Sequence, residues 1–112
     1  MQIRIQTVDE ALVVRVRGDL TRAAASELLG EIDKELAPTA RDVVLNLQDV
    51  ERVDADALAY LFRIQQRTRS GARSFRLTGA RDSALRLFAC TNVAAKLDLA
   101  ASEDDALRMS VR

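Results

Sequence analysis

Apolar and polar residues alternate in two short stretches at the start of the chain, at positions 1–10 and 11–18. Alternation with a period of two is typical of a strand that buries one face and exposes the other. The apolar members are Ile3 and Ile5 in the first stretch and Leu12, Val14 and Val16 in the second. Asp9 and Glu10 stand between the stretches and favour a tight reversal, so the pattern predicts an antiparallel pair of strands.

The spacing then becomes helical, because apolar residues recur every three or four positions over residues 21–36. Thr21 can cap this helix, and Pro38 is expected to stop it because the residue before a proline avoids the α conformation. A third strand is predicted at residues 42–50. Its residues 43–45 are apolar on both faces, which is typical of a strand covered from both sides.

The second half of the chain repeats the alternation of helix and strand. A second helix is predicted over about residues 56–68, with an apolar stripe that contains Leu58, Leu61, Phe62 and Gln65. The remaining elements are a strand marked by Phe75 and Leu77, a helix marked by Ala84, Leu85 and Phe88 that ends near Asn92, a strand at residues 97–99, and a last helix opened by Ser102 and Asp105.

The predicted order is β-β-α-β-α-β-α-β-α, and it defines the fold class. Strands that alternate with helices indicate a central sheet with parallel pairs, because each crossover helix returns the chain in the same direction. The sequence therefore predicts a single α/β domain over residues 1–112. We expect a mixed sheet of about five strands, with helices packed mainly on one face.

The reactive side chains argue against an enzyme. The chain has no histidine, so it lacks the usual general base and the commonest metal ligand. Its single cysteine, Cys90, excludes an internal disulfide and a thiolate zinc site, and its apolar surroundings favour a small buried thiol. The four glycines form no phosphate-binding loop. We therefore expect no enzymatic activity, no metal and no cofactor.

Charge and hydropathy narrow the class of partner. Acidic and basic residues balance at 17 each, which favours neither DNA nor a polyanionic substrate. Six arginines and no acid occupy residues 63–81, a pattern that suits a solvated face or an acidic protein; nucleic acid is disfavoured because interleaved aromatics are missing. No apolar run approaches the roughly 20 residues of a membrane span, and no leader precedes the first strand. A cytoplasmic location without direct membrane insertion is expected.

Asp54 and Asp56 precede the second predicted helix and allow several interpretations. A short acid there can accept hydrogen bonds from the first turn and favours the positive end of the helix dipole. The end of a parallel strand that leads into a helix is also where open α/β sheets bind ligands, so Asp56 can equally belong to a partner-binding surface. Asp54 is expected to shape the turn through hydrogen bonds. The two carboxylates alone are too few for a metal site.

Residues 43–61, VVLNLQDVERVDADALAYL, resemble the central motif of STAS domains, the family of bacterial anti-sigma factor antagonists and sulfate-transporter tails. Asp54 matches the Asp of the family's Asp-Ser-Ser/Thr-Gly-Leu motif, and Leu58 matches its Leu. VVRVRGDLT at residues 13–21 is similar to the family's second strand and its exit. ALRLFACTNVAAKLDLAASEDDAL at residues 84–107 is similar to the C-terminal helix, turn, strand and helix, so the resemblance covers the whole chain.

The sequence departs from the family at the position that partner kinases phosphorylate in the switching members. Asp56 stands where the second Ser/Thr of the motif is expected, Ala55 replaces the first Ser, and Ala57 replaces the Gly. Asn92 stands in place of a turn glycine. No serine or threonine occurs in residues 50–67. Asp56 is therefore interpreted as a possible fixed imitation of the phosphorylated residue, since both carry negative charge.

The resemblance implies a partner-binding surface at the start of the second helix, with residues 18–21 beside it. Asp56, Tyr60, Arg63 and Arg67 are spaced to lie along one line of that helix. Tyrosine and arginine are common at protein interfaces, although a solvated face with Tyr60 packed on neighbouring side chains explains the same spacing. The candidate partner-binding residues are Gly18, Asp19, Leu20, Thr21, Asp54, Asp56, Ala57, Tyr60, Arg63 and Arg67.

Two kinds of partner are consistent with the resemblance. The first is an anti-sigma factor or serine-kinase-like protein, bound reversibly by a non-enzymatic regulatory module. The second is the ATPase of a phospholipid or sulfate/anion transporter complex, on which this chain would dock as a small STAS subunit. The chain is expected to be a monomer or a weak homodimer in either case.

Overall fold

The computed structural model describes residues 1–9, 11–36, 42–70, 73–90, 99–100 and 102–110. These residues form, in chain order, β1 (Gln2–Val8), β2 (Ala11–Arg17), α1 (Arg22–Leu36), β3 (Asp42–Asp49), the 3-10 turn η1 (Ala55–Ala57), α2 (Leu58–Ser70), β4 (Phe75–Thr78), α3 (Asp82–Cys90), β5 (Leu99–Ala100) and α4 (Glu103–Ser110). The predicted order of strands and helices is confirmed.

The five strands form one mixed sheet in the order β1-β2-β3-β4-β5. β1 and β2 pair antiparallel, from Gln2 opposite Arg17 to Val8 opposite Ala11, as the alternating pattern predicts. Asp9 in the connecting turn has a φ of 49°, a left-handed conformation that Asp tolerates better than most residues. The other neighbouring strands pair in parallel. β3 therefore has a partner on each side.

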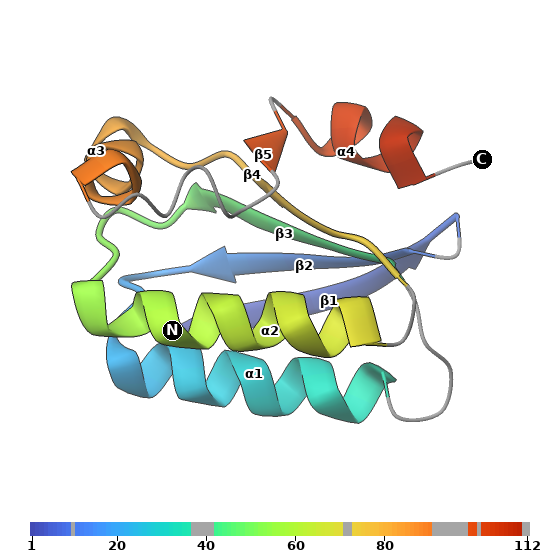
Figure 1. Ribbon diagram of the computed structural model, residues 1–112, viewed down its shortest axis with the longest axis horizontal. Coiled ribbons are helices and arrows are strands. Elements are labelled where there is room, and N and C mark those ends of the chain that lie inside the picture. Colours follow the sequence, from blue (N-terminus) through green and yellow to red (C-terminus); the bar gives the residue numbers. More distant parts are fainter. Residues whose placement is uncertain (10, 37–41, 71–72, 91–98, 101, 111–112) are drawn as a thin grey trace.

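Helices cover the two faces of the sheet unequally (Figure 1). α1 and α2 lie side by side across one face and enclose the main hydrophobic core, to which α3 contributes Ala84 and Phe88. α4 lies on the other face, where Ala106 packs with Val13 and Val44 in a smaller cluster. Three of the four helices thus bury residues on the same face, in agreement with the prediction.

Hydrogen bonds at the helix starts show which of the capping residues predicted from the sequence cap a helix. The Thr21 hydroxyl accepts a hydrogen bond from the backbone N–H of Ala24 at 3.1 Å, which confirms it as the cap of α1. The Ser102 hydroxyl does the same for Asp105 at 3.1 Å. α2 begins at Leu58 rather than at Asp56, because η1 occupies the preceding residues with tighter hydrogen bonding.

Some sequence predictions lie outside the part of the molecule that the structure describes. They concern the stop at Pro38, the turn at Asn92, the strand residue Leu97 and the burial of the Cys90 thiol. The described strand in that region is β5, which starts at Leu99. Within the described ranges, no helix is both long enough and apolar enough to cross a membrane.

Candidate functional site

The loop after β2 and the loop after β3 are joined by backbone hydrogen bonds. The N–H of Leu20 donates to the carbonyl oxygen of Arg52 at 2.8 Å, and the N–H of Asp54 donates to the carbonyl oxygen of Leu20 at 3.0 Å. Leu20 and Val53 form an isolated parallel bridge, and the Leu20 side chain is buried in the main core. The loop at residues 18–21 and the start of the second helical segment therefore lie side by side.

Gly18 makes the sharp exit from β2 that this pairing needs. Its φ is +111°, a conformation that residues with a Cβ rarely adopt. Its N–H donates to the carbonyl oxygen of Asp49 at 3.2 Å, which holds the end of β2 against the end of β3. Asp19 is exposed just beyond this turn, and Thr21 is engaged as the cap of α1.

The two carboxylates at the start of the second helical segment do not cap it. Asp54 occupies the position before η1 in an extended conformation, and its side chain makes no capping hydrogen bond. Its backbone carbonyl instead accepts from the N–H of Ala57 at 3.0 Å. Asp56 lies inside η1, so it is not at the cap position, and its side chain is exposed. The interpretation of Asp56 as a helix cap is therefore wrong, because the 3-10 turn moves the cap position two residues earlier.

Arg22, the first residue of α1, completes a charged cluster around Tyr60. Hydrogen bonding from the Arg22 guanidinium lowers the pKa of the Tyr60 hydroxyl, and the nearby charge of Arg63 acts in the same direction. The same hydrogen bond raises the pKa of Arg22, followed by the charge of Tyr60 when it is ionised and by the negative charge of Asp56. Arg63 also stacks over the Tyr60 ring, with its Cζ 5.2 Å from the ring centre, a favourable cation–π geometry.

These side chains surround a shallow depression of about 290 Å³, lined by Arg22, Ala55, Asp56, Ala59, Tyr60 and Arg63. It brings together one carboxylate and two guanidinium groups, so it presents both signs of charge to a partner. Three of the predicted residues, Asp56, Tyr60 and Arg63, are brought together here. Arg22 was missed by the sequence analysis because nothing local marks it; only its place after the cap Thr21 points to a helix start.

Arg67 has a different environment from the rest of the predicted line. Its guanidinium Nη1 lies 3.0 Å from Asp33 Oδ2 of α1, which ties the exposed edges of α1 and α2 together. It does not line the depression around Tyr60. Asp54 and the loop residues Gly18, Asp19 and Leu20 also lie outside this depression, although the loop pairing holds them next to η1. Ala57, the last residue of η1, is fully buried in the main core.

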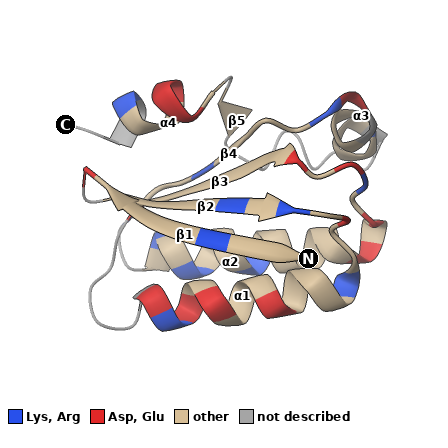
Figure 2. Cartoon of the chain, turned by 180° about the vertical axis from the view of Figure 1, so that it is seen from behind, with Lys and Arg blue, Asp and Glu red and all other residues tan. Residues whose placement is uncertain are grey.

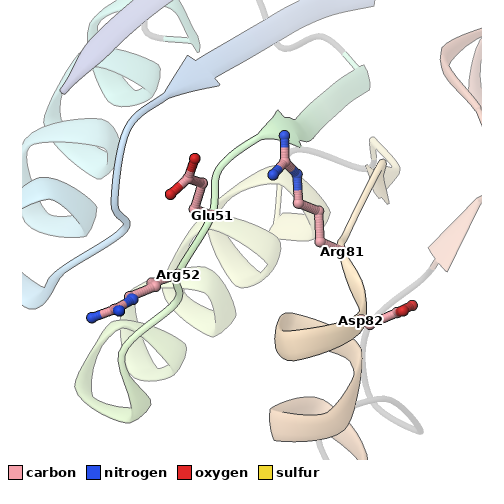
Figure 3. Close-up of a pocket in the computed structure, with 4 residues that line it drawn as sticks. All are labelled: Glu51, Arg52, Arg81 and Asp82. Atoms are coloured by element: carbon pink, nitrogen blue, oxygen red, sulfur yellow. The ribbon is translucent and has the colours of Figure 1, made fainter.

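A second depression of about 600 Å³ lies on the other side of the β3–η1 loop and is lined by Glu51, Arg52, Arg81 and Asp82 (Figure 3). Arg81 reaches back toward the end of β3, where its Nε donates to the carbonyl oxygen of Gln48 at 3.0 Å. Arg52 and Asp82 point away from each other. In the described part of the chain, no group of three or more His, Cys, Asp or Glu residues is arranged to hold a metal ion.

Several solved structures have the same fold. A protein of Thermotoga maritima described as a candidate anti-sigma factor antagonist superposes with a TM-score of 0.90 at 20% identity, covering 98% of this chain and 95% of the other. An anti-sigma factor antagonist from Mycobacterium paratuberculosis gives 0.86 at 20% identity, covering 99% and 94%. The murine anion transporter Slc26a9 gives 0.79 at 12% identity, covering 94% of this chain but 18% of the transporter.

At these identities the superpositions establish the fold alone. No curated protein matches the sequence significantly. A family model described as "Mlab, STAS domain" matches residues 3–100, which is most of the chain. The sequence resemblance, the sheet topology and this match agree, and the chain belongs to the STAS domain family.

Proposed function

We propose that this STAS domain is a non-enzymatic regulatory module of the cytoplasm that binds an anti-sigma factor or a kinase-like protein reversibly. The binding surface is the depression around Tyr60 together with the adjoining loop at residues 18–21. The observation that carries the proposal is the clustering of Asp56, Arg22, Tyr60 and Arg63 at the point where the family motif places its Ser/Thr. Solved relatives of the same fold include anti-sigma factor antagonists.

The partner recognises this surface through the carboxylate of Asp56. Its exposed carboxylate supplies a permanent negative charge that needs no kinase. A partner that rejects the phosphorylated form of related domains would reject this surface, and a partner adapted to a carboxylate would bind it. Arg22 and Arg63 on either side limit the net charge, so the partner surface should carry both an acid and a base.

A second candidate function is docking on the ATPase of a transporter complex. The occurrence of the same fold within the Slc26a9 anion transporter supports it only as far as it links STAS domains to transport as well as to anti-sigma factors. The same depression would then contact the ATPase. The two candidates differ in the identity of the bound protein.

A site-specific crosslink tests both candidates. The photoreactive residue p-benzoylphenylalanine is placed at Ala59, which is exposed and lines the depression, and the protein is irradiated in its native host. The matched control places it at Ala89, an exposed alanine of α3. We expect a discrete adduct from Ala59 and none from Ala89. Mass spectrometry of the adduct separates an anti-sigma or kinase-like protein from an ATPase, and equal capture at both positions would contradict the proposed surface.

A further inference from the structure

On the face of the sheet opposite α1 and α2, the described helices leave Arg4 of β1 and Arg17 of β2 exposed, although α4 packs on Val13 of β2. α1 and α2 cover the opposite face, and α4 lies mainly against β3, β4 and β5. In Figure 2, blue bands mark basic residues on β1 and β2, with α1 and α2 on one side of these strands and α4 on the other. The face is distinct from the depression around Tyr60, which lies on the side of α1 and α2.

The strand register gathers arginines on this open face. Leu12, Val14 and Val16 of β2 enter the main core, so the alternating Arg15 and Arg17 point to the other side of the sheet. Arg4 lies directly opposite Arg15 in the ladder, and Gln2 lies opposite Arg17. We call Gln2, Arg4, Gln6, Arg15 and Arg17 the arginine face. Part of it forms a depression of about 170 Å³ between Arg4 and Arg17.

Only one of the three arginines is neutralised. Arg15 binds the Glu103 carboxylate of α4 through Nε and Nη2, both at 2.8 Å, and its Nη1 donates to the Gln6 side-chain oxygen at 2.8 Å. Arg4 and Arg17 form no ion pair with any residue that the structure describes. Like charges on opposing positions of neighbouring strands destabilise a sheet. This applies to Arg4 and Arg15. A carboxylate bound beside Arg4 and Arg17 would offset the repulsion among the three guanidinium groups of this face, and guanidinium geometry suits it.

We propose that the arginine face is a docking surface for an acidic segment of another protein, with one of its carboxylates seated between Arg4 and Arg17. Acids border the positive charge: Asp49 lines the same depression, and Glu103 occupies the side next to α4. A polyanion with continuous charge, such as nucleic acid or an anionic membrane, would be repelled by these two acids. A short run of carboxylates can fit between them. This surface does not depend on the proposed function at Asp56.

Binding of a fluorescein-labelled peptide of eight glutamates, followed by anisotropy with the full chain, tests the proposal. We expect saturable binding that weakens at least ten-fold in the Arg4→Gln/Arg17→Gln variant. The matched control, Arg73→Gln/Arg86→Gln, removes the same charge from exposed positions outside the arginine face and should change the affinity less than two-fold. Amide chemical shifts of the unmodified protein should change in residues 2–8 and 11–17, and this measurement needs no variant.

Other outcomes would overturn the proposal. Absence of saturable binding, or equal loss in both variants, would mean that the peptide responds only to net charge. Shifts confined to α1 and α2 would place the acidic segment elsewhere. Equal affinity for a single-stranded oligonucleotide of eight nucleotides or for anionic lipid vesicles would replace the protein partner by another polyanion. Self-association lost in the Arg4→Gln/Arg17→Gln variant would assign the face to a second copy of the chain.

Discussion

The carboxylate of Asp56 is exposed in η1 and has no hydrogen-bond partner among the described residues. Its contribution to folding comes from its charge, which acts on the start of α2, worth about 0.3–1 kcal/mol at an exposed position, and on the nearby exposed Arg22. Asp56→Ser and Asp56→Ala should therefore both leave the melting temperature nearly unchanged. This differs from a capping residue, for which replacement by Ala typically costs about 1 kcal/mol.

If Asp56 is read by the partner, both variants should shift the partner's dissociation constant by more than about ten-fold, or roughly 1.4 kcal/mol. Tighter binding of the Ser variant would identify the carboxylate as a built-in inhibitory charge, and weaker binding would identify it as a contact. Glu35→Gln, which removes an exposed carboxylate from the far end of α1, is the control. Affinities of both Asp56 variants equal to that of the parent protein would refute the recognition role.

Tyr60 reports directly on the charged cluster because it is the only tyrosine and the chain has no tryptophan. Hydrogen bonding from Arg22 lowers the pKa of its hydroxyl, so tyrosinate absorbance near 295 nm should rise at a pH below the usual midpoint of about 10. Arg22→Gln should return the midpoint toward the usual value, whereas Arg86→Gln on α3 should not move it. A wild-type midpoint at or above the usual value would contradict the described arrangement.

At the scale of elements, α4 is held on the sheet by its small apolar contact and by polar contacts of Glu103 with Arg15 and Asn46, which we call the Glu103 latch. Glu103 accepts two hydrogen bonds from Arg15 of β2 and one from the Asn46 side chain of β3. The hydrogen bond from Arg15 lowers the pKa of Glu103, followed by that from Asn46. The latch therefore stabilises the fold above the ordinary Glu pKa, and this stabilisation disappears as the pH falls through the lowered pKa.

Glu103→Gln should reduce the free energy of unfolding at pH 7 by about 1 kcal/mol, the usual size for a partly exposed ion pair. The difference from the parent protein should shrink when both are measured at a strongly acidic pH, below the ordinary Glu range, because the ionised form of Glu103 then contributes less to stability. Asp104→Asn, which removes the neighbouring exposed carboxylate of α4, should cost little at either pH. Chemical denaturation at the two pH values gives the comparison, and a pH-independent difference would argue against the ionic latch.

At the scale of the whole molecule, β3 joins the two layers. Val43 and Leu45 enter the main core, Val44 enters the smaller cluster under α4, and all three are fully buried. The amides of residues 43–47 should be among the slowest to exchange with deuterium, since their opening requires global unfolding. The amides of the edge strand β1 should exchange faster. Rapid exchange in β3 under native conditions would contradict the assigned topology.

The order of the elements could be predicted from the sequence because each depends on near neighbours along the chain. Alternation identified β1 and β2, the unbroken apolar run at residues 43–45 identified a strand between two layers, and Thr21 marked the start of α1. Half of the candidate site was also predictable, since Asp56, Tyr60 and Arg63 lie within two turns of one segment. These features rest on local periodicity and capping chemistry.

The remaining features of the candidate site and of the arginine face depend on contacts between parts of the chain that are far apart in the sequence. Arg22 joins the Tyr60 cluster because the Leu20–Val53 bridge brings the start of α1 beside η1. The arginine face exists because the hairpin register sets Arg4 against Arg15, and Glu103 reaches Arg15 across 88 positions of sequence. η1 places Asp56 inside a 3-10 turn, away from the cap position, while its last residue, Ala57, is buried in the main core. No local pattern encodes these pairings, because register and packing are fixed only when the whole core assembles.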